Sequence, residues 1–435
     1  MSAETLPLKK TGFPVRELRA EVLTGTDQGR SVTAESAISV GSAEGNTLRL
    51  EDRTVSRFHL ELSRHGEEIV VTDRGSTNGT RIGPVRLDGV SGSVAPGAVL
   101  ELGGTKLRVD DGKVVLIDAG PSELSGLFGR SPVMRQLFAT LSKVALTEVP
   151  VLVLGESGTG KELIGRAVHE HSRRSEAPLV TVDCGALSPS LFASELFGHE
   201  RGAFTGAHRR HLGAFERAAG GTVFLDEVGE LPAELQSALL GVLERKLLRR
   251  VGGSEDVKVD VRVVSATSRD LRRQVNRDGF RLDLFYRLAG VVVSVPPLRD
   301  RPEDIVALAE RFAREAGFER PLSELLEIER FARHSWPGNV RELKNTVLGA
   351  LALGEAPDFS VSEGAADELS SNVDGWLATL PLNYRMARDR ITDTFERHYL
   401  KRVLAETDGN IREAARRGQI NRSYLMELLK KHGLR

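Results

Sequence analysis

An eight-residue segment at 155–162, GESGTGKE, has residue types suited to holding a chain of phosphates. Its glycines let backbone N–H groups wrap around an anion, and Lys161 adds a positive charge for the outer phosphates. The apolar run VPVLVL precedes the segment and the helical pattern ELIGRAVHEH follows it, so a helix N-terminus faces the anion. This context predicts a nucleotide-binding P-loop rather than a glycine-rich turn without a ligand. The predicted loop consists of Gly155, Glu156, Ser157, Gly158, Thr159, Gly160, Lys161 and Glu162.

The position after Lys161 departs from the usual P-loop, in which a Ser or Thr hydroxyl ligates magnesium, because it is Glu162. A second motif, GGTVFLDEVGEL at 220–231, is an apolar strand pattern that ends in Asp226 and Glu227. We expect Asp226 to hold Mg²⁺, directly or through water, and Glu227 to orient and polarise the attacking water. Paired surface charges are the alternative, but the place of the pair after a buried strand favours ATP hydrolysis.

Three arginines lie in segments that suggest an assembly of several subunits. Arg281 and Arg287 are in GFRLDLFYRLAG, and Arg341 follows a Pro-Gly turn in WPGNVRELKN. An arginine that reaches the γ-phosphate neutralises charge that develops in the transition state. If a neighbouring subunit supplies it, hydrolysis depends on oligomerisation. An arginine taken alone is more often a surface or ion-paired residue, so the two neighbouring motifs are what favour a functional role.

The stretch GAFTGA lies between the P-loop and the Asp-Glu strand. Its glycines accept backbone angles that other residues resist, which predicts a mobile turn. The large side chain of Phe204 then offers an apolar contact to a partner that docks transiently, with Thr205 as a polar contact. A buried hairpin phenylalanine is the alternative. The predicted contact loop consists of Gly202, Ala203, Phe204, Thr205, Gly206 and Ala207.

The composition limits the class of protein that carries these motifs. The 435 residues are too many for one compact core, and 60 Lys and Arg nearly balance 61 Asp and Glu, so any DNA contact must come from a local patch. The single cysteine, Cys184, cannot form an internal disulfide, and no signal-peptide pattern opens the chain, which favours a reducing cytoplasm. No apolar run approaches the roughly 18 residues that cross a bilayer, so an integral membrane protein is excluded.

Local texture divides the chain into three folded regions. Short strands broken by Gly and Asn turns predict an all-β sandwich, alternating strands and helices predict an α/β domain, and a compact helical tail follows a polar linker. The expected order is the sandwich at 20–112, a linker at 113–125, the α/β domain at 126–355 with a helical lid from about 298, a linker at 356–375 and the all-α domain at 376–435.

Six motifs follow one another between residues 126 and about 353: GESGTGKE, SELFGHERGAFTGA, GGTVFLDEVGELP, FRLDLFYRL, VPPLRDRPEDI and WPGNVREL. Together they resemble the AAA+ domain of bacterial sigma-54-dependent transcriptional activators, also called enhancer-binding proteins. A glutamate after the P-loop lysine is that family's own form. The resemblance covers about half of the chain.

The resemblance implies a homo-oligomer, from dimer to ring hexamer, in the bacterial cytoplasm. Such a ring spends ATP, with Mg²⁺, to remodel the closed complex of sigma-54 RNA polymerase so that promoter DNA opens. The loop GAFTGA would touch sigma-54 itself. By motif position the remaining roles would be phosphate binding by Lys161, metal and water binding by Asp226 and Glu227, action across the subunit boundary by Arg281 and Arg287, and nucleotide sensing by Ser268 and Arg341.

Two positions depart from the pattern of this family. Ser268 replaces the Asn that is common at the first sensor, and Asp183 replaces the Asn that restrains the catalytic glutamate. An aspartate beside Glu227 would repel it unless it were protonated or bridged. Neither change removes the core machinery, so we expect ATPase activity with altered kinetics.

The tail from 395 to 435 holds ten Lys and Arg against five Asp and Glu, in a chain that is otherwise close to neutral. The segment NIREAARRGQINRSYLMELLKKHG makes two short helical patterns, and we expect the second, 422–431, to enter the major groove of DNA. The tail resembles the Fis-type helix-turn-helix, although RGQI replaces the more usual Leu-Gly before the isoleucine. A basic hairpin used for packing is the alternative. The expected DNA contacts are Arg422, Ser423, Tyr424 and Lys430.

Near the N-terminus, TVSRFH and DRGSTNGT resemble the forkhead-associated (FHA) domain, which binds phosphothreonine on partner proteins. Arg57 suits this chemistry because a guanidinium matches phosphate bidentately. Ser42 stands where the family has a second phosphate-binding arginine, so a scaffold for phosphate-independent contacts stays open. The expected phosphopeptide site consists of Ser42, Ser56, Arg57, Thr77 and Asn78, with His59 bracing the loop.

Two functions from different classes remain for the whole chain. One is a sigma-54 activator whose N-terminal domain responds to a threonine-phosphorylated protein or a Ser/Thr kinase, and the other is a DNA-bound regulator that never engages sigma-54. The intact GAFTGA favours the first. An AAA+ unfoldase or replication initiator would leave the loop and the Fis-like tail unexplained.

Overall fold

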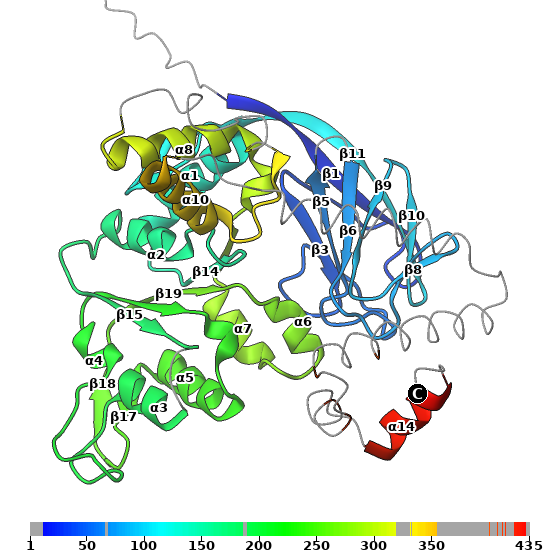
Figure 1. Ribbon diagram of the computed structural model, residues 1–435. Coiled ribbons are helices and arrows are strands. Elements are labelled where there is room, and N and C mark those ends of the chain that lie inside the picture. The colour runs from blue at the N-terminus through cyan, green and yellow to red at the C-terminus, as the bar shows by residue number, and fades with distance from the viewer. Residues whose placement is uncertain are drawn as a thin grey trace, which may run out of the picture. The chain divides into compact units, whose positions relative to one another are not determined.

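The computed structural model describes residues 12–65, 68–185, 189–318, 331, 333–354, 400, 407, 411, 414 and 422–431. The chain divides into two compact units, Met1–Pro357 and Asp358–Arg435. The first unit contains a β-sandwich, an α/β domain and a set of lid helices (Figure 1). The predicted fold class, an N-terminal all-β domain, a central α/β domain with a helical lid and a helical C-terminal part, is confirmed.

Two sheets form the sandwich. One has the strand order β2-β1-β11-β10-β7-β8, and the other has the order β4-β3-β5-β6-β9. The strands are β1 (Gly12–Thr24), β2 (Ser31–Ala34), β3 (Ala37–Gly41), β4 (Leu48–Arg49), β5 (Leu60–His65), β6 (Glu68–Asp73), β7 (Thr80–Ile82), β8 (Val85–Leu87), β9 (Ser91–Val94), β10 (Val99–Leu102) and β11 (Thr105–Asp118).

Alternating side chains of both sheets fill the sandwich core. Leu18, Ala20 and Val22 of β1 are buried, and the intervening residues of the strand are more exposed, as the period of two in a strand requires. β1 pairs antiparallel with β11 along most of its length, so that β11 continues to Asp118, within the range expected for the first linker.

Two buried polar residues fasten the loops at one end of the sandwich. The carboxylate of Asp73 accepts hydrogen bonds from the backbone N–H groups of Ser76 (2.9 Å) and Gly89 (3.0 Å) and from the hydroxyls of Ser76 (2.7 Å) and Thr80 (2.8 Å). His59 accepts from the N–H of Ser56 through Nδ1 and lies 3.3 Å from the carbonyl of Gly79 through Nε2. Burial lowers the pKa of His59, so the ring is neutral and braces the loop as expected.

The α/β domain is built on five parallel strands in the order β15-β16-β19-β14-β20. Parallel strands all end at the same edge, which brings the segments that follow β14, β16 and β19 together there. The strands are β14 (Val151–Leu154), β15 (Leu179–Asp183), β16 (Thr222–Asp226), β19 (Arg262–Thr267) and β20 (Val291–Ser294).

Helices cover both faces of this sheet because its strands are apolar on both sides (Figure 1). α1 (Pro132–Ala145) and α2 (Lys161–Glu170) pack with Val151 and Val153, and Leu152 faces the opposite cluster. The helices of that second cluster are α3 (Pro189–Phe197), α4 (Ala214–Arg217), α5 (Ala233–Arg245), α6 (Leu271–Asn276) and α7 (Leu282–Leu288).

Within the residues that the structure describes, the lid includes η2 (Leu298–Asp300), α8 (Pro302–Glu315) and α10 (Asn339–Leu353). Asp304 of α8 is fully buried and accepts hydrogen bonds from the N–H groups of Arg130 and Ser131 and from the Ser131 hydroxyl. The start of α1 is therefore tied to the lid. The first of these elements, η2, follows β20 in the chain.

The second unit is described chiefly through α14 (Arg422–Lys431), whose Leu425 and Leu429 are buried in a cluster with Leu400 and Ala414. The remainder of the expected helix-turn-helix lies outside the described residues.

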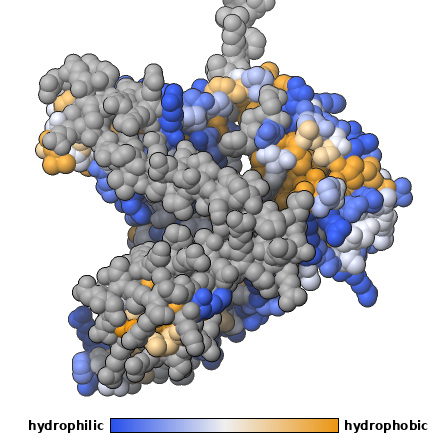
Figure 2. Space-filling view, turned by 45° about the vertical axis from the view of Figure 1, so that its right-hand side comes forward, coloured by the Kyte–Doolittle hydropathy of each residue, from blue (hydrophilic) through white to orange (hydrophobic). Residues whose placement is uncertain are grey.

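Over the described part of the chain, no helix combines the length and apolarity that a membrane span needs. Figure 2 shows hydrophilic side chains over much of the coloured surface, with an apolar patch on the sandwich.

We predict that Asp73→Ala destabilises the sandwich by about 2–3 kcal/mol, because four donors would lose a buried acceptor. Burial raises the pKa of Asp73, but these hydrogen bonds outweigh it and hold the pKa below its usual value. The stabilisation is therefore present above about pH 4 and is lost as the pH falls through the depressed pKa. Hydrogen exchange of the β6 and β7 amides in urea measures the effect.

The control is Glu101→Ala, which removes an exposed carboxylate paired only with Lys106 in the same sandwich. We expect this change to cost far less stability than Asp73→Ala, because an exposed ion pair is screened by water. Equal protection of β6 and β7 in the two variants would contradict the role of Asp73.

Candidate functional site

The loop between β14 and α2 has the backbone that a P-loop requires. Gly158 and Gly160 have φ angles of 78° and 101°, in the left-handed region that favours glycine. A Cβ on Gly158 would lie 2.2 Å from the carbonyl oxygen of Gly338, so only glycine fits where the lid meets the loop. Thr159 closes the turn with a hydroxyl bond to the carbonyl of Glu156, and Glu162 lies exposed in the first turn of α2.

Lys161 points into this loop rather than into solvent. Its ammonium group donates to the carbonyl oxygens of Gly155 (3.0 Å) and Glu156 (3.3 Å) and pairs with the carboxylate of Glu227 at 3.1 Å. Only 7% of the residue is exposed. A cation held within a glycine-rich loop that opens a helix is suited to bind the outer phosphates of a nucleotide.

Glu227 stands at the end of β16 in a conformation that is uncommon for its residue type, with φ of 50°. One carboxylate oxygen, Oε2, accepts from the N–H (2.8 Å) and the hydroxyl (2.9 Å) of Ser268 and from the hydroxyl of Thr267 (3.4 Å). Burial raises the pKa of Glu227, but the hydrogen bonds of Ser268 and Lys161 outweigh it and lower the pKa. The residue is therefore ionised, as an acceptor for a water proton must be.

The neighbouring Asp226 has the opposite electrostatic environment. Burial and the charge of Glu227 raise its pKa, and the charge of Asp183 contributes in the same direction. A buried carboxylate with two acidic neighbours fits a bound Mg²⁺, whose other ligands would come from nucleotide phosphates and water. The described residues offer no group of three or more His, Cys, Asp or Glu that could hold a metal by themselves.

Asp183 lies beside Asp226, because the two residues pair at the ends of β15 and β16. Asp183 accepts a hydrogen bond from the N–H of Gly185 at 2.8 Å, and its charge raises the pKa of Asp226. Glu227 accepts hydrogen bonds from the backbone N–H and the hydroxyl of Ser268.

The lid contacts the P-loop through residues that the sequence analysis did not assign to the site. Arg299 forms a bidentate ion pair with Glu156, at 2.6 and 2.9 Å. Asn339 donates from Nδ2 to Glu156 (3.1 Å) and to the carbonyl of Ser157 (3.0 Å). The only signal for these residues was their place in VPPLRDRPEDI and WPGNVREL.

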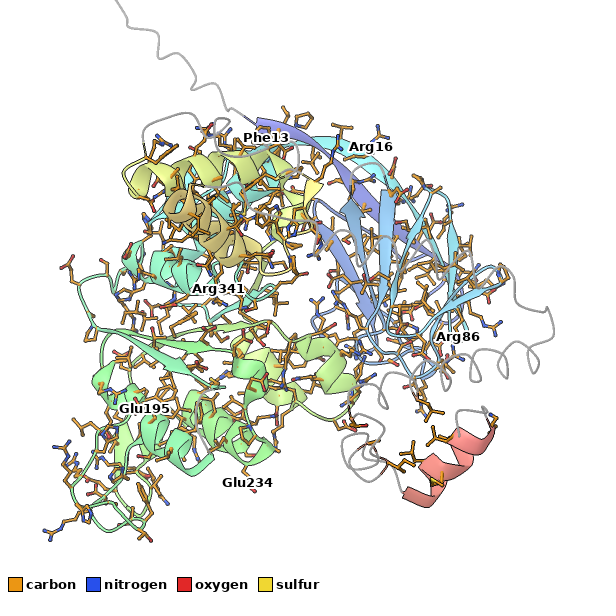
Figure 3. The ribbon with its side chains drawn as sticks, in the orientation of Figure 1. Phe13, Arg16, Arg86, Glu195, Glu234 and Arg341 are labelled. Carbon is orange, nitrogen blue, oxygen red and sulfur yellow. The ribbon has the colours of Figure 1, made fainter. Side chains whose placement is uncertain are left out.

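Arg341, the expected second sensor, lies at the same loop. Its backbone N–H donates to the carbonyl of Gly158, and its guanidinium donates to the hydroxyl of Ser157 at 3.2 Å (Figure 3). The structure thus brings Arg341, Ser268, Lys161 and the Asp-Glu pair together around the P-loop, as the sequence predicted.

The two remaining arginines do not join this group within one chain. Arg281 pairs with Asp283 at 2.7 Å and donates to the hydroxyl of Ser237, and Arg287 donates to the carbonyl of Leu243. Within the described residues, neither contacts the P-loop or the Asp-Glu pair. Both lie at α7 with exposed guanidinium groups, an arrangement that leaves them available to a neighbouring subunit.

The GAFTGA segment forms a closed turn with its aromatic residue at the surface. The N–H of Gly202 donates to the carbonyl of Ala207, and Gly202 and Gly206 have left-handed φ angles of 84° and 101°. Phe204 is 37% exposed and contacts only the edge of the His199 ring among the ring pairs described. The buried alternative for Phe204 is therefore wrong.

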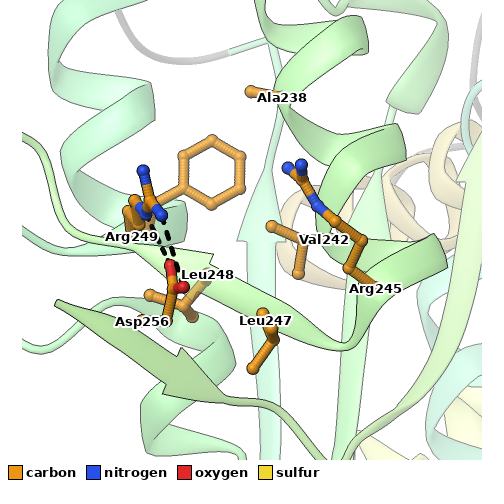
Figure 4. A pocket seen from close by; sticks show the side chains of 8 residues that line it. Ala238, Val242, Arg245, Leu247, Leu248, Arg249 and Asp256 are labelled. Atoms are coloured by element: carbon orange, nitrogen blue, oxygen red, sulfur yellow. Dashed lines mark hydrogen bonds and ion pairs between the residues drawn. The ribbon is translucent and has the colours of Figure 1, made fainter. Parts of the chain in front are cut away.

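The base of this turn is fixed by a buried cation. Arg250 is 5% exposed and binds Glu216 with two bonds of 2.5 and 2.9 Å and Glu200 with one of 2.9 Å. The adjacent hairpin, β17 (Leu247–Arg249) and β18 (Asp256–Lys258), forms a hollow with α5 that is separate from the P-loop (Figure 4). The bonds of Arg250 to Glu216 and Glu200 therefore hold the base of the GAFTGA loop in place.

Most of the expected phosphopeptide residues meet at one end of the sandwich. The N–H of Thr77 donates to the hydroxyl of Ser56 at 3.0 Å, the N–H of Ser42 donates to the carbonyl of Ser56, and Asn78 donates to the carbonyl of Thr54. Arg57 differs, because its guanidinium pairs with Asp278 of the α/β domain at 2.7 Å.

The expected DNA contacts Arg422, Ser423, Tyr424 and Lys430 all belong to α14. Their side chains lie outside the described residues. The expectation that they reach DNA therefore stays a prediction.

Comparison with known families divides the chain in the same way. Residues 127–294 match the Sigma-54 interaction domain, residues 299–363 match the AAA+ ATPase lid domain, and residues 392–432 match the Bacterial regulatory protein, Fis family. Residues 21–113 match the family described as inner membrane component of T3SS, cytoplasmic domain.

Among curated proteins, the chain is 42% identical over 311 residues to the regulatory protein AtoC of Escherichia coli K12, covering 70% of this chain and 67% of AtoC. It is 38% identical to the DNA-binding transcriptional regulator NtrC of Azospirillum brasilense, covering 72% and 71%. Among solved structures, NtrX from Brucella abortus in complex with ATP is 39% identical, with a TM-score of 0.49 and coverage of 72% and 70%. A phosphothreonine-dependent FHA domain is 28% identical, with a TM-score of 0.20 and coverage of 22% and 95%.

We predict that Lys161→Ala weakens the binding of a nucleoside triphosphate by about 10- to 100-fold, because one charged hydrogen-bond donor is lost. Glu227→Gln should bind at least as tightly as the wild type, since the carboxylate that competes with phosphate for Lys161 is neutralised. Titration with a fluorescent ATP analogue measures both. Lys113→Ala, on the exposed edge of β11, is the control and should bind normally.

Proposed function

Because the chain belongs to the family of bacterial sigma-54-dependent transcriptional activators, we propose that it binds upstream DNA, oligomerises and hydrolyses ATP to remodel the closed promoter complex of sigma-54 RNA polymerase. Membership rests on the identity with AtoC and NtrC and on the three matching family models. The sequence's prediction of this family, with its AAA+ ATPase, is confirmed by these matches.

The observation that carries the proposal is the cluster of Lys161, Glu227 and Ser268 at the edge of the sheet. Lys161 and Glu227 form an ion pair at 3.1 Å. When a γ-phosphate takes Lys161, the oxygen Oε1 of Glu227 is released, while Ser268 continues to hold Oε2. The released oxygen can then accept a proton from the attacking water.

Asp226 is the residue proposed to hold Mg²⁺ beside the phosphates. Bound there, the ion would neutralise charge on the β- and γ-phosphate oxygens. The raised pKa of Asp226, caused by burial and by Glu227, supports a site that gains from a cation. The lid would report the nucleotide through Arg341 at Ser157 and through the Arg299–Glu156 pair.

Arg281 and Arg287 are proposed to complete the site of the neighbouring subunit. Their exposure and their lack of contact with the P-loop of their own chain, over the described residues, support this role. Hydrolysis would then require assembly, because each site needs a cation that only a neighbour supplies.

The loop GAFTGA is proposed to contact sigma-54 through Phe204 and Thr205. The exposed ring of Phe204 and the fixed base at Arg250 support a loop that presents an apolar contact without collapsing onto its own domain. A DNA-bound regulator that never engages sigma-54 would have no use for this exposed ring.

For the sandwich, we propose recognition of a threonine-phosphorylated protein or kinase by Ser56, Arg57, Thr77 and Asn78. The convergence of Ser56, Thr77 and Asn78 at one end of the sandwich supports it. Ser42 contributes its backbone to the same loop but no cation, so Arg57 carries the charge recognition.

Thr205→Ala should abolish ATP-dependent promoter opening while the rate of ATP hydrolysis stays within about twofold of the wild type, because Thr205 lies far along the chain from the P-loop and on the outer turn. Permanganate footprinting with purified sigma-54 holoenzyme measures opening. Thr33→Ala, an exposed threonine of β2, is the matched control. Equal promoter opening by the wild type, Thr205→Ala and Thr33→Ala would contradict a role for the loop in promoter opening.

Subunit mixing tests the two trans arginines. Lys161→Ala and Arg287→Ala rings should each be inactive, but a 1:1 mixture should regain roughly a quarter of the wild-type ATPase rate, because that share of interfaces combines an intact Lys161 with an intact Arg287. A mixture as inactive as its parents would show that Arg287 acts within its own chain. The same design applies to Arg281.

A further inference from the structure

The end of the sandwich that holds the expected phosphate site lies against the α/β domain within the first compact unit. The side chain of Asn276, the last residue of α6, binds both backbone groups of one sandwich residue, Phe58. Its Oδ1 accepts from the N–H of Phe58 (3.2 Å), and its Nδ2 donates to the carbonyls of Phe58 (2.5 Å) and Arg74 (3.1 Å). These bonds pair backbone groups of the very loop that would receive a phosphopeptide.

The aromatic ring of Phe58 supplies the apolar part of this contact. Phe58 is 2% exposed and belongs to the core cluster of the α/β domain rather than to the core of the sandwich. Its ring packs edge to face on Phe285 of α7 at 5.1 Å, and the guanidinium of Arg272 lies over it at 5.8 Å. A large apolar side chain beside Arg57 is thus used as an anchor between domains.

Ion pairs surround this anchor. Arg74 of the sandwich pairs with its own Glu61 (2.9 Å) and with Asp270 of the α/β domain (2.7 Å), and Arg272 pairs back with Glu61. The network is partly buried, with 17–30% of each side chain exposed. Charge complementarity therefore fixes the register of the contact.

The phosphate-binding candidate itself is occupied by a carboxylate of the α/β domain. The guanidinium of Arg57 donates to Asp278 (2.7 Å) and to the backbone carbonyl of Asn276 (3.3 Å). The Asp278 side chain is 83% exposed, so the pair is weakly held. A phosphothreonine carries a charge near −2 and can bind a guanidinium with two parallel bonds, so it can replace a single exposed carboxylate.

The covered segment connects two parts of the ATPase site. α6 begins three residues after Ser268, which holds Glu227, and its N-cap is Asp270, the partner of Arg74. α7 carries Phe285 beside Arg287, and the hydroxyl of the adjacent Tyr286 donates to the carbonyl of Glu44 in the sandwich. A hollow lined by Glu61 and Arg74 of the sandwich also reaches Gly155, Glu156 and Ser268.

We propose that Asp278 and the phosphate of a threonine-phosphorylated partner compete for Arg57, so that partner binding releases the sandwich from α6 and α7. The docked sandwich restrains the segment between Ser268 and Arg287, and its release raises ATP hydrolysis. This inference rests on the proposed recognition of phosphothreonine by the sandwich. It adds that the recognition site and the intramolecular contact are one surface.

Full-length protein tests the competition with a pool of phosphothreonine peptides, read by fluorescence anisotropy, and the matching unphosphorylated pool. Asp278→Asn removes the competing charge and suits the left-handed backbone of that residue, which has φ of 56°. Asn276→Ala removes the side-chain bonds to Phe58. We expect peptide affinity to rise about threefold in Asp278→Asn and more in Asn276→Ala, and basal ATPase activity to rise in both.

Three further proteins sharpen the result. Glu101→Gln, an exposed carboxylate paired within the sandwich, is the matched control and should equal the wild type in affinity and ATPase rate. Arg57→Ala should lose peptide binding and gain basal ATPase activity. The exchange of charges, Arg57→Asp with Asp278→Arg, should restore the low ATPase rate of the docked state but leave it insensitive to phosphopeptide.

Hydrogen exchange of the α6 amides provides the direct readout, and it should increase when phosphopeptide is added to the wild type. Equal peptide affinity in the wild type, Asp278→Asn and Asn276→Ala would overturn the competition while leaving phosphothreonine recognition intact. Equal binding of phosphorylated and unphosphorylated pools by every variant would overturn the recognition and the competition together. An unchanged ATPase rate in Asn276→Ala would overturn the restraint of the ATPase.

Discussion

The ion pair between Lys161 and Glu227 is the interaction around which the central domain is arranged. It joins the helix that follows β14 to the end of β16, and it exists because parallel strands finish at one edge of the sheet. Burial raises the pKa of Glu227, but the hydrogen bonds from Ser268 and Lys161 outweigh it and keep the carboxylate ionised. Phosphate is the ligand that can take the place of the carboxylate and thereby change the state of both residues.

The residues around this pair connect it to α6 and to the lid, so a change at the pair can affect both. Ser268 fixes the second oxygen of Glu227 and directly precedes the segment that leads into α6. On the other side, the lid touches the P-loop through Arg299, Asn339 and Arg341. The strand ends, the lid and the start of α6 therefore all lie around the P-loop. The GAFTGA turn is instead held at its base by the buried Arg250.

The sandwich is connected to the α/β domain through a guanidinium that can bind either a carboxylate or a phosphate. Arg57 has the side chain that phosphate recognition needs, and the α/β domain presents a carboxylate to it. Phe58 enters the core cluster of the other domain, which makes the contact more than a surface ion pair. One guanidinium can bind either partner because carboxylate and phosphate oxygens both accept hydrogen bonds from its N–H groups.

The sequence by itself indicated the loop between β14 and α2, the strand that ends in Asp226 and Glu227, the GAFTGA turn, and the order of the β-sandwich, the α/β domain and the helical C-terminal part. Short-range patterns of glycine, charge and apolar spacing encode these features, and each lies within one strand, turn or helix. Only the tertiary structure decided that Asp183 lies beside Asp226, that Arg299 and Asn339 bind Glu156, and that Asp278 pairs with Arg57. The reason is physical. These partners lie 43 to more than 200 residues apart, and the residues around a charge do not reveal which distant charge will lie beside it in the folded chain.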